Sequence, residues 1–459
     1  MGELGVGCAL VVGLGRSGVP AVRALLEVGA AVVATDREPH NEHADALRAI
    51  GATVILGVSG EDQVDGVDVV VPSPGVPEHA PVLRRAAALD VPVWSEPELG
   101  WRLSPRSLIA VTGTNGKTTV TELTTAMLQA GDRDAVACGN IGHPFTTAVR
   151  EAAPNAVLVA ELSSFQLRFA ETLRPAVGVL LNLAPDHLDW HGDVAAYGAA
   201  KARLWRAQQE GDWAVGNLDD EPSAALVRAH APARVAWFSR TTVPEVGVGV
   251  DGGRLVTRLP DHSGAVVDTG ELRSAAPHHL ANVAAAACAA LLGGGSPESV
   301  AEASRAYRPG RHRLEIVADH GGVRWINDSK ATNPHAAAAA LRAAATDHER
   351  SVVWIAGGQS KGVDLAVLAD ELGCVRHAIL IGEAAPELAD IAARADVAVT
   401  RAPSIEEAVA VAADLTRPGD TVLLAPACAS FDQFRDYAER GDRFARAART
   451  VTAGTAARR

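Results

Sequence analysis

The chain reads Val111-Thr-Gly-Thr-Asn-Gly-Lys-Thr-Thr119 at the point that decides its fold. An apolar run at residues 108–112 predicts a buried strand, and residues 120–130 have the pattern of a helix. A glycine-containing loop between a strand and a helix directs backbone N–H groups and the positive end of the helix dipole toward phosphate. The strict P-loop pattern has glycine where Val111 stands, but strand, loop, Gly-Lys-Thr and helix follow in the required order. We therefore predict a P-loop domain that binds a nucleotide.

The side chains of this loop suit a nucleoside triphosphate. Lys117 can reach the terminal phosphates, and the hydroxyl of Thr118 can bind Mg²⁺. Backbone amides around them can cradle phosphate at the helix N-terminus. The residues that we expect to contact ATP here are Thr114, Asn115, Gly116, Lys117, Thr118 and Thr119.

Two apolar runs further along the chain end abruptly in polar residues. Residues 156–160 lead into Glu161, and residues 177–181 lead into the segment that contains His187. Buried parallel strands emerge at one edge of a sheet, where ligands usually bind. Glu161 stands where a P-loop fold has its metal-binding acid, so we expect it to bind Mg²⁺. We expect His187 to open onto the same cleft, although Mg²⁺ prefers carboxylate oxygen to histidine nitrogen.

Lysine is scarce in this chain. Of 42 Lys and Arg residues only four are lysine, and all four stand near motif-like clusters: Lys117, Lys201, Lys330 and Lys361. Because arginine supplies the other cations, each lysine is expected where a compact or deprotonatable amine is required. Lys201 lies in a predicted helix at residues 194–209 and could be an ordinary surface lysine. An uncharged lysine can also react with CO₂ to form a carbamate, an anionic oxygen ligand for Mg²⁺, and we predict this role for Lys201.

The amino-terminal segment contains a second phosphate-binding pattern. Gly13-Leu-Gly-Arg-Ser-Gly18 is a full GxGxxG between a predicted strand at residues 8–12 and a predicted helix at residues 19–29. Asp36 ends the next strand, where a ribose-binding acid would lie. Such a turn can bind any diphosphate at the helix N-terminus, or it can be a tight turn without a ligand. We expect it to hold a nucleotide sugar rather than NAD.

The predicted strands and helices indicate an α/β protein with three domains. We place a Rossmann-like domain at residues 1–104, a central P-loop ATPase-like domain with a mostly parallel sheet at 105–309, and a second Rossmann-like domain at 310–459. In the third region, predicted strands at residues 323–326, 351–356, 378–381 and 421–425 alternate with helices. Three segments are expected to interrupt this pattern: a linker around Pro97 and Pro105, a small antiparallel insert at residues 233–272, and a frayed tail from Arg446.

Composition and charge argue against several classes of function. The net charge of −13 disfavours a nucleic-acid partner, because phosphate backbones are bound mainly by distributed cations. The five cysteines are odd in number and lack CxxC spacing, which fits a reducing compartment better than a disulfide framework or a zinc site. No apolar run approaches the ~18 residues of a membrane span. We expect a cytoplasmic monomer that acts on small molecules, without a nucleic-acid or membrane partner.

These motifs resemble those of the Mur ligase family over nearly the whole chain. The other stretches that carry the resemblance are Ser73-Pro-Gly75, Gly139-Asn-Ile-Gly142, Glu161-Leu-Ser-Ser-Phe-Gln-Leu167, Asp186-His-Leu-Asp189, Asp328-Ser-Lys-Ala-Thr-Asn333 and Pro426-Ala-Cys-Ala-Ser-Phe-Asp-Gln-Phe434. The last two are typical of members that add glutamate. The resemblance implies ATP-dependent ligation of D-glutamate to UDP-N-acetylmuramoyl-L-alanine through an acyl phosphate, in peptidoglycan precursor synthesis. It also implies two bound Mg²⁺ ions, with Mn²⁺ as a substitute.

The resemblance assigns residues to each site. Lys117, Thr118 and Glu161 would bind the terminal phosphates and the first Mg²⁺, and His187 and carbamylated Lys201 would bind the second. Matches to nucleotide-contacting positions are Asn282, Arg313 and Asp328. The UDP-substrate site would comprise Gly15, Arg16, Ser17, Asp36, Arg37, Ser73, Gly75, Asn140 and His187. Matches to glutamate-binding positions are Thr332, Lys361, Ser430 and Tyr437, and Lys330 would orient the reacting groups.

Three positions depart from the family pattern. His279 follows His278 where His-Asn is more usual, which alters the expected contact with adenine. Tyr437 stands in place of phenylalanine, and Arg16 is bulkier and more polar than expected in the first turn.

Three alternatives remain open at the level of sequence. A sibling ligase would add a different amino acid or act on folate, although Asp328-Ser-Lys-Ala-Thr-Asn333 favours glutamate and a muramoyl substrate. A nicotinamide-dependent oxidoreductase would explain the GxGxxG turn but not the P-loop, Glu161 or the four lysines, and a change in NADH fluorescence on mixing would reveal it. A non-catalytic nucleotide-binding switch would bind ATP without releasing phosphate.

Overall fold

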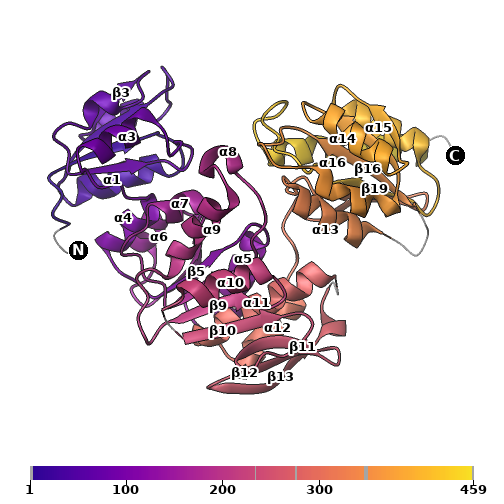
Figure 1. Ribbon diagram of the computed structural model, residues 1–459, viewed down its shortest axis with the longest axis horizontal. Coiled ribbons are helices and arrows are strands. Elements are labelled where there is room, and N and C mark those ends of the chain that lie inside the picture. Colours follow the sequence, from indigo (N-terminus) through magenta and orange to yellow (C-terminus); the bar gives the residue numbers. More distant parts are fainter. Residues whose placement is uncertain (1–3, 233, 274–275, 346–349, 457–459) are drawn as a thin grey trace. The chain divides into compact units, whose positions relative to one another are not determined.

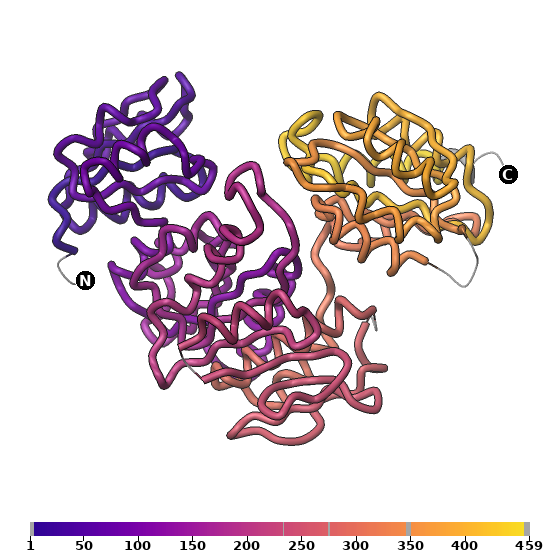
Figure 2. The backbone as a smooth tube through the Cα atoms, in the orientation of Figure 1, coloured from indigo at the N-terminus to yellow at the C-terminus, as the bar shows by residue number. Residues whose placement is uncertain are grey.

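A computed structural model of the chain describes residues 4–232, 234–273, 276–345 and 350–456 (Figure 1). Contacts within the chain divide it into two units, Met1–Leu183 with Trp190–Tyr307, and Ala184–Asp189 with Arg308–Arg459. Figure 2 follows the same backbone as a tube, in which residues 308–459 run from orange to yellow. The α/β class predicted from the sequence is confirmed, because three sheets of mostly parallel strands alternate with helices along the chain. In the described residues, no helix is both long and apolar enough to cross a membrane.

The first sheet is four-stranded and parallel, in the order β3-β2-β1-β4. Its strands are β1 (Cys8–Val12), β2 (Ala31–Asp36), β3 (Thr53–Leu56) and β4 (Val69–Pro72), and its helices are α1 (Gly18–Glu27), α2 (Ala44–Ala49), the short η1 (Glu61–Gln63) and α3 (Pro81–Ala88). Helix α1 buries its apolar side in the core next to β1. The first residue of this helix, Gly18, must be glycine, because a Cβ there would lie 1.9 Å from the carbonyl oxygen of Gly13. The turn is therefore closed tightly over the end of β1.

The second sheet has nine strands in the order β13-β12-β11-β10-β9-β8-β5-β7-β6. The strands are β5 (Leu108–Thr112), β6 (Ala135–Gly139), β7 (Val157–Glu161), β8 (Val177–Leu180), β9 (Trp213–Asn217), β10 (Arg234–Ser239), β11 (Gly247–Asp251), β12 (Arg254–Leu259) and β13 (His262–Asp268). All five residues of β5 are buried, and alternate ones enter two different cores. Strand β5 is therefore covered on both faces, as the centre of a parallel sheet must be.

Helices cover both faces of this sheet. One core contains apolar residues of α5 (Lys117–Ala130), α11 (Pro277–Leu292) and α12 (Pro297–Ala306). The other core contains residues of α6 (Phe145–Glu151), α7 (Ser164–Arg168), η2 (Arg203–Trp205) and α10 (Glu221–His230). The first unit also contains α9 (Val194–Ala202) and the short η3 (Thr269–Glu271). In α8 (Leu188–His191), the first two residues are assigned to the second unit and the last two to the first unit. The predicted mostly parallel central sheet is confirmed.

The antiparallel pairing expected for residues 233–272 is confirmed for β11, β12 and β13 but not for β10, and Ala233 itself lies outside the described residues. Strand β10 pairs in parallel with β9, β11 pairs in parallel with β10, and only β11, β12 and β13 pair antiparallel. Gly247 permits the parallel pairing, since a Cβ there would lie 1.8 Å from the carbonyl oxygen of Trp237. The segment therefore extends the central sheet.

The third sheet lies in the second unit and has six strands in the order β14-β15-β19-β16-β17-β18. The strands are β14 (Glu315–His320), β15 (Val323–Asn327), β16 (Val352–Gly357), β17 (Val375–Ile381), β18 (Ala398–Arg401) and β19 (Thr421–Leu424). The helices are α13 (Pro334–Ala344), the 3-10 segment η4 (Ala366–Cys374), α14 (Ala385–Arg394), α15 (Ile405–Leu415) and α16 (Tyr437–Ala456). The four predicted strands are present, and the prediction missed β14 and β18. Both missed strands lie at the edges of the sheet and are more exposed than β16 or β19.

Two segments that were expected to be irregular are helical. The predicted linker around Pro97 is helix α4 (Glu96–Leu103), where proline occupies the first turn and Ser95 accepts a hydrogen bond from the N–H of Glu98. Residues 446–456 of the predicted frayed tail continue α16, which ends at Ala456, and residues 457–459 of that tail lie outside the described residues. Its residue Ala448 is fully buried, so packing keeps this part of the helix ordered.

Glu98 of helix α4 anchors the loop that precedes β8. Its fully buried carboxylate accepts hydrogen bonds from the backbone N–H groups of Glu171, Thr172 and Leu173 at distances of 2.9–3.1 Å. The guanidinium of Arg102 also donates to it, at 2.7 Å. Burial opposes ionisation of Glu98, but the hydrogen bonds from Thr172 and its neighbours outweigh burial and lower the pKa.

The Glu98→Gln variant should lose about 2–3 kcal/mol of unfolding free energy at pH 7, because an amide NH₂ cannot accept the backbone N–H groups that the carboxylate satisfies. Since the folded-state pKa is lowered, the wild-type advantage is present above the ordinary pKa of 4.5 and shrinks as the pH falls through the folded-state value. Urea unfolding at pH 7 and pH 4 measures both effects. The exposed Glu171→Gln is the control, and equal stability of the two variants at pH 7 would contradict the anchoring role.

Candidate active site

The P-loop connects β5 to α5, and two glycines allow its shape. Gly116 has φ +84°, and a Cβ there would lie 2.5 Å from the side-chain oxygen of Asn282 in α11. Gly113 has φ +154°, and its Cβ would lie 2.9 Å from Leu181. Both positions therefore require glycine, and Asn282 lies directly against the loop that the sequence predicts to hold phosphate.

Two of the four lysines point at the same loop carbonyl. Lys117 Nζ donates to the carbonyl oxygens of Gly113 and Thr114, each at 2.9 Å. Lys201 Nζ also donates to Gly113, at 2.9 Å, and it lies 4.4 Å from the ring centre of Tyr197. The Lys201 side chain is 1% exposed, so it is not a surface lysine. Burial disfavours a charged amine, and an uncharged amine is the form that reacts with CO₂.

The helix that carries Lys201 is shorter than residues 194–209. Helix α9 ends at Ala202, and the chain then tightens into the 3-10 turn η2. Trp205 in this turn is fully buried, and its indole N–H donates to the carbonyl oxygen of Gly178 at 3.0 Å. Packing of Trp205 against β8 therefore ends the helix.

A buried carboxylate meets the P-loop helix at the end of β7. Thr118 Oγ1 donates to one oxygen of Glu161 at 2.6 Å, and Asn140 Nδ2 donates to the other oxygen at 2.9 Å. Glu161 is 3% exposed. Hydroxyl and carboxylate oxygens are the ligands that Mg²⁺ prefers, so this pair fits the metal. In the described part of the chain, no group of three or more His, Cys, Asp or Glu side chains is arranged to hold a metal ion.

Asn182 holds the P-loop, and the sequence had assigned it no role. Its Oδ1 accepts from the N–H groups of Thr114 and Asn115, at 3.1 and 2.9 Å, and its Nδ2 donates to the carbonyl oxygen of Asn115 at 3.1 Å. The residue lies beyond the end of β8, which is the neighbour of β5. Its position after an apolar strand was the only signal in the sequence. The loop that surrounds the predicted phosphate site is therefore fastened from the adjacent strand.

The residues predicted for the UDP-substrate lie at the carboxyl ends of neighbouring strands. Asp36, at the end of β2, accepts from the N–H of Leu14 at 2.7 Å, and Ser73, after β4, donates from its hydroxyl to the carbonyl oxygen of Gly13 at 2.8 Å. Both side chains thus brace the GxGxxG turn. The turn contains Gly15, Arg16 and Ser17, while Arg37 follows β2 and Gly75 follows β4.

Arg16 is the polar departure noted in this turn. Its guanidinium donates to the carbonyl oxygens of Asn140 and Gly142, at 3.4 and 2.5 Å. Asn140 is also the donor to Glu161, so hydrogen bonds run from the GxGxxG turn to the carboxylate beside the P-loop. The larger side chain at Arg16 makes this connection possible.

The segment Ala184–Asp189 belongs to the second unit and contains His187. Asp186 is 5% exposed, and its carboxylate accepts from Asn333 Nδ2 at 3.2 Å and lies 3.6 Å from Lys361 Nζ. The backbone N–H of His187 donates to the same carboxylate at 2.9 Å, and His187 and Lys361 have φ values of +54° and +55°. The sequence gives Asp186 no role of its own, yet its carboxylate pairs with Lys361, a predicted glutamate-binding lysine.

The predicted glutamate-binding residues follow three adjacent parallel strands of the second unit. Thr332 follows β15, Ser430 follows β19 and Lys361 follows β16. Tyr437 begins α16, and its ring centre lies 5.0 Å from Lys330 Nζ. Adjacent parallel strands end at the same edge of a sheet, so the fold gathers these residues on one side of the unit.

Asp328 and Arg313 lie near one another in the second unit. Burial raises the pKa of the Asp328 carboxyl to about 7, although a hydrogen bond from the N–H of Leu314 and the charge of Arg313 oppose this rise. A carboxyl with a raised pKa beside a cation is typical of functional sites.

His279 is neutral and stacked in the first unit. The side chain is 5% exposed, and its ring lies 6.2 Å from the ring of Tyr307 at an interplanar angle of 17°. Burial and the nearby His278 lower the pKa of His279 to about 4. A buried neutral imidazole therefore occupies the position where the sequence departs from the family pattern.

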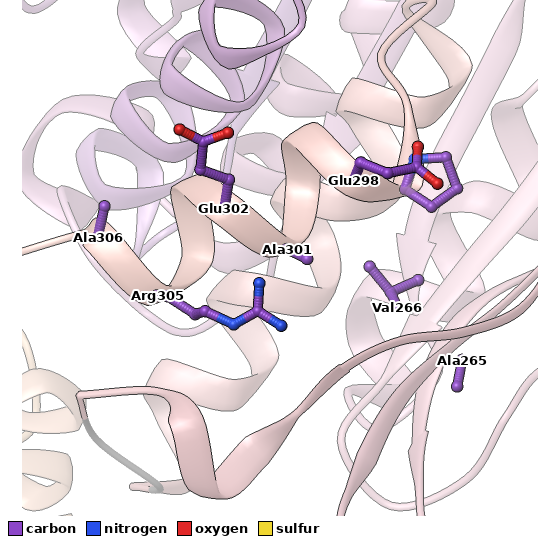
Figure 3. A pocket seen from close by; sticks show the side chains of 8 residues that line it. Ala265, Val266, Glu298, Ala301, Glu302, Arg305 and Ala306 are labelled. Atoms are coloured by element: carbon purple, nitrogen blue, oxygen red, sulfur yellow. The ribbon is translucent and has the colours of Figure 1, made fainter.

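A surface hollow in the first unit contains none of the predicted residues. Residues of β13 and α12 line it, with Glu298, Glu302 and Arg305 as the charged side chains (Figure 3). Arg305 pairs with Glu271, so its charge is already compensated. This hollow gives no support for a second site of chemistry.

Three protein-family models match successive parts of the chain. They describe a Mur ligase MurD-like N-terminal domain at residues 8–95, a Mur ligase middle domain at residues 111–290, and a Mur ligase glutamate ligase domain at residues 312–428. Several relatives named UDP-N-acetylmuramoylalanine--D-glutamate ligase match over nearly their full length. The relative from Frankia casuarinae is 48% identical, and the match covers 96% of this chain and 93% of that protein. The relative from Pelotomaculum thermopropionicum is 42% identical, and the match covers 95% of this chain and 96% of that protein.

Solved structures of low identity share the fold. UDP-N-acetylmuramate-alanine ligase MurC from Thermotoga maritima has a TM-score of 0.60 at 18% identity, with 97% of this chain and 99% of that chain covered. MurF ligase from Thermotoga maritima, in complex with ADP, has a TM-score of 0.60 at 16% identity, with 97% and 95% covered. At these identities the likeness concerns the three-domain architecture alone.

Removal of the Asn182 amide should loosen the P-loop. We expect Asn182→Ala to weaken ATP binding by about tenfold or more, because two loop N–H groups lose their acceptor and the phosphate-facing amides lose their fixed directions. Isothermal titration with ATP and Mg²⁺ measures the change. The exposed Asn155→Ala is the control, and an unchanged affinity in Asn182→Ala would contradict the fastening role.

Acid should destabilise the first unit through His279. Since the folded-state pKa is about 4 and the ordinary value is 6.5, the unfolded chain binds more protons in this window, and stability is lost as the pH falls from 6.5 toward 4. The expected loss is about 1.4 kcal/mol per pH unit. Denaturant unfolding at pH 7, 6 and 5 should show a shallower loss for His279→Leu than for the wild type. Parallel pH profiles would contradict a neutral buried His279.

Proposed function

Because the chain belongs to the Mur ligase family, we propose that it is an ATP-dependent ligase that joins D-glutamate to UDP-N-acetylmuramoyl-L-alanine in peptidoglycan precursor synthesis. The observation that carries this proposal is the match, at up to 48% identity and over nearly the full length, to relatives that are named for this ligation. The three family models, which together extend from residue 8 to residue 428, agree with it.

The reaction has two steps. The alanyl carboxylate attacks the γ-phosphorus of ATP, which forms an acyl phosphate and releases ADP. The amine of glutamate then attacks the acyl carbon, and the tetrahedral intermediate collapses to the amide, phosphate and a proton. Both steps depend on positioning and on neutralisation of charge, since orientation alone can be worth about 7–11 kcal/mol.

The P-loop would hold ATP. In this proposal the backbone from Thr114 to Thr119 cradles the phosphates, and Lys117 turns from the loop carbonyls toward the terminal phosphates. Asn282, which lies against Gly116, would contact the nucleotide, as would Arg313 and Asp328. The amine of Lys117 already lies at this loop, 2.9 Å from two of its carbonyl oxygens.

The oxygens of Thr118 and Glu161 would hold the first Mg²⁺, which would neutralise phosphate charge. We assign a second ion to His187 and to Lys201 as its carbamate. Support for Lys201 comes from its burial and its position at the carbonyl of Gly113, because a carbamate there adds an anionic oxygen beside the P-loop. Mn²⁺ has similar ligand preferences and would serve as a substitute.

The UDP-substrate would bind at the carboxyl edge of the first sheet. We assign its site to Gly15, Arg16, Ser17, Asp36, Arg37, Ser73, Gly75, Asn140 and His187. The backbone of the GxGxxG turn at the start of α1 can receive the diphosphate. The hydrogen bonds from Arg16 to Asn140 and from Asn140 to Glu161 connect this site with the metal-binding carboxylate.

Glutamate would bind in the second unit, through Thr332, Lys361, Ser430 and Tyr437, and Lys330 would orient the reacting groups. The contact between Lys361 and Asp186 supports this assignment, because it shows a carboxylate paired with the ammonium group that would receive one of glutamate. We also propose that the enzyme acts as a cytoplasmic monomer. A sibling ligase that adds another amino acid is the alternative that the following experiment tests.

Phosphate release with ATP, Mg²⁺ and UDP-N-acetylmuramoyl-L-alanine, measured with D-glutamate, L-glutamate and L-lysine singly, tests the proposed reaction. We expect release and a UDP-linked amide product with D-glutamate only. In Lys117→Met turnover should fall by at least ~1,000-fold, because the cation that meets the transferred phosphate is lost. Release with a different amino acid would support the sibling ligase, and near-normal turnover of Lys117→Met would refute the phosphate assignment.

The carbamate at Lys201 has its own test. Lys201→Ala should be inactive, and about 100 mM formate or acetate should partly restore turnover if a small carboxylate can take the place of the carbamate oxygens. Mass spectrometry of the intact wild type in ¹³C-bicarbonate after chemical trapping should show one labelled lysine. A folded variant that no carboxylate rescues, together with an unlabelled wild type, would refute the carbamate.

A further inference from the structure

Arg440 is a fully buried arginine in the first turn of α16. Its side chain is 0% exposed, and within the described ranges no carboxylate lies within ion-pair distance of it. Burial lowers the pKa of Arg440 to about 10, so the group is still a cation at neutral pH. The helix dipole also disfavours a cation at a helix N-terminus. A charge in such a position destabilises the fold unless its hydrogen bonds compensate.

The guanidinium donates its hydrogen bonds to three loops. Nε donates to Ser329 Oγ at 3.0 Å and Nη2 to the Ser329 carbonyl at 2.9 Å. Nη1 is shared among the carbonyl oxygens of Cys428, Gly357 and Ala429, at 3.2, 3.4 and 3.4 Å. These acceptors lie at or just beyond the ends of β15, β19 and β16, which are consecutive strands of the sheet. One planar side chain therefore ties together the carboxyl ends of three neighbouring strands.

Other contacts make this connection stiff. Ser329 Oγ, which accepts from Arg440, donates to the carbonyl oxygen of Tyr437 at 2.7 Å. Gln359 and Ala429 exchange two backbone hydrogen bonds, at 2.9 and 3.0 Å, between the loops that follow β16 and β19. The acceptors of Arg440 and its own helix are thus joined to one another as well as to the guanidinium.

The four residues assigned to glutamate are adjacent to these acceptors in sequence. Thr332 follows Ser329 by three positions, Lys361 follows Gly357 by four, Ser430 follows Ala429 directly, and Tyr437 precedes Arg440 by three. A shift of the guanidinium would therefore move all four relative to one another. None of them is on the same loop as all the others, so their relative positions depend on the contacts that connect the loops, and Arg440 makes several of these contacts.

We propose that Arg440 is a positioning residue for the incoming amino acid: its guanidinium fixes three loops and the start of α16 in the arrangement that binds both carboxylates of glutamate. This inference rests on the proposed function. It assigns to Arg440 no contact with substrate, because the side chain is enclosed. Arginine suits this place because its five N–H donors are spread over three nitrogens of a rigid planar fork, whereas the three donors of lysine lie on one nitrogen.

The test compares Arg440→Lys, Ser329→Ala and the control Arg443→Lys. Arg443 lies on the same helix as Arg440, is partly exposed and pairs with Glu406 of α15. Two rates are measured for each full-length protein: amide formation against D-glutamate concentration, and exchange of labelled ADP into ATP with UDP-N-acetylmuramoyl-L-alanine but without glutamate. The exchange reports acyl phosphate formation, in which glutamate takes no part.

We expect Arg440→Lys to raise the KM for D-glutamate by about 100-fold and Ser329→Ala by about fivefold, with exchange within about threefold of the wild type. The control should match the wild type in both rates. Two results would overturn the proposal: an unchanged KM for D-glutamate, or a fall in the rate of ADP–ATP exchange as large as the fall in the rate of amide formation. Either result would mean that Arg440 only stabilises the fold. A wild type without D-glutamate-dependent product would instead overturn the proposed function itself.

Discussion

Parallel strands place their carboxyl ends on one edge of a sheet, and this constraint determines where the chemistry of this chain can lie. The interior strands β5, β7 and β8 are apolar and buried, and their backbone groups are used in the ladder. Polar side chains become available only where each strand ends. Thr118, Glu161 and Asn182 therefore meet at one edge although they are far apart in sequence.

The loops at these edges are held by polar side chains, of which Asn182, Asp36 and Ser73 are half-buried and Arg440 is fully buried. Asn182 fastens the P-loop, Asp36 and Ser73 brace the GxGxxG turn, and Arg440 ties three loops of the second unit. In each case one side chain satisfies backbone groups that a loop leaves unpaired. A fully satisfied polar network is rigid, and rigid loops keep phosphate-binding and carboxylate-binding groups in fixed directions. The family's reaction, which transfers phosphate and then forms an amide, depends on such fixed directions.

Much of the fold could be predicted from the sequence, because strand and helix signals in this chain are local. Apolar runs that end in glycine or acidic residues marked β1, β5 and β7, and the order of β and α elements implied parallel sheets. The errors occurred where tertiary contacts override local signals. Pro97 suggested a linker but occupies the first turn of α4, and Gly247 allowed β11 to join the central sheet. The end of α9 depends on the packing of Trp205, which no local pattern reveals.

For the candidate site, the sequence identified side chains with reactive chemistry but not those that position them. Lys117, Thr118 and Glu161 were recognisable because their types and spacing suit phosphate and metal. Asn182, Asp186 and Arg440 act through distant backbone groups or a distant lysine, so nothing in their neighbouring sequence indicates their partners.

We infer that the P-loop, with Thr118 and Glu161, holds a metal-bound triphosphate. Crystals grown with Mn²⁺ and a non-hydrolysable ATP analogue, with diffraction recorded at the manganese absorption edge, would locate the metal and the phosphates. We expect an anomalous peak bonded to the hydroxyl of Thr118 and to the phosphates in the loop at residues 113–119, with Glu161 as its carboxylate neighbour. Phosphates bound instead at the turn of residues 13–18, or a metal peak remote from Thr118 and Glu161, would contradict it.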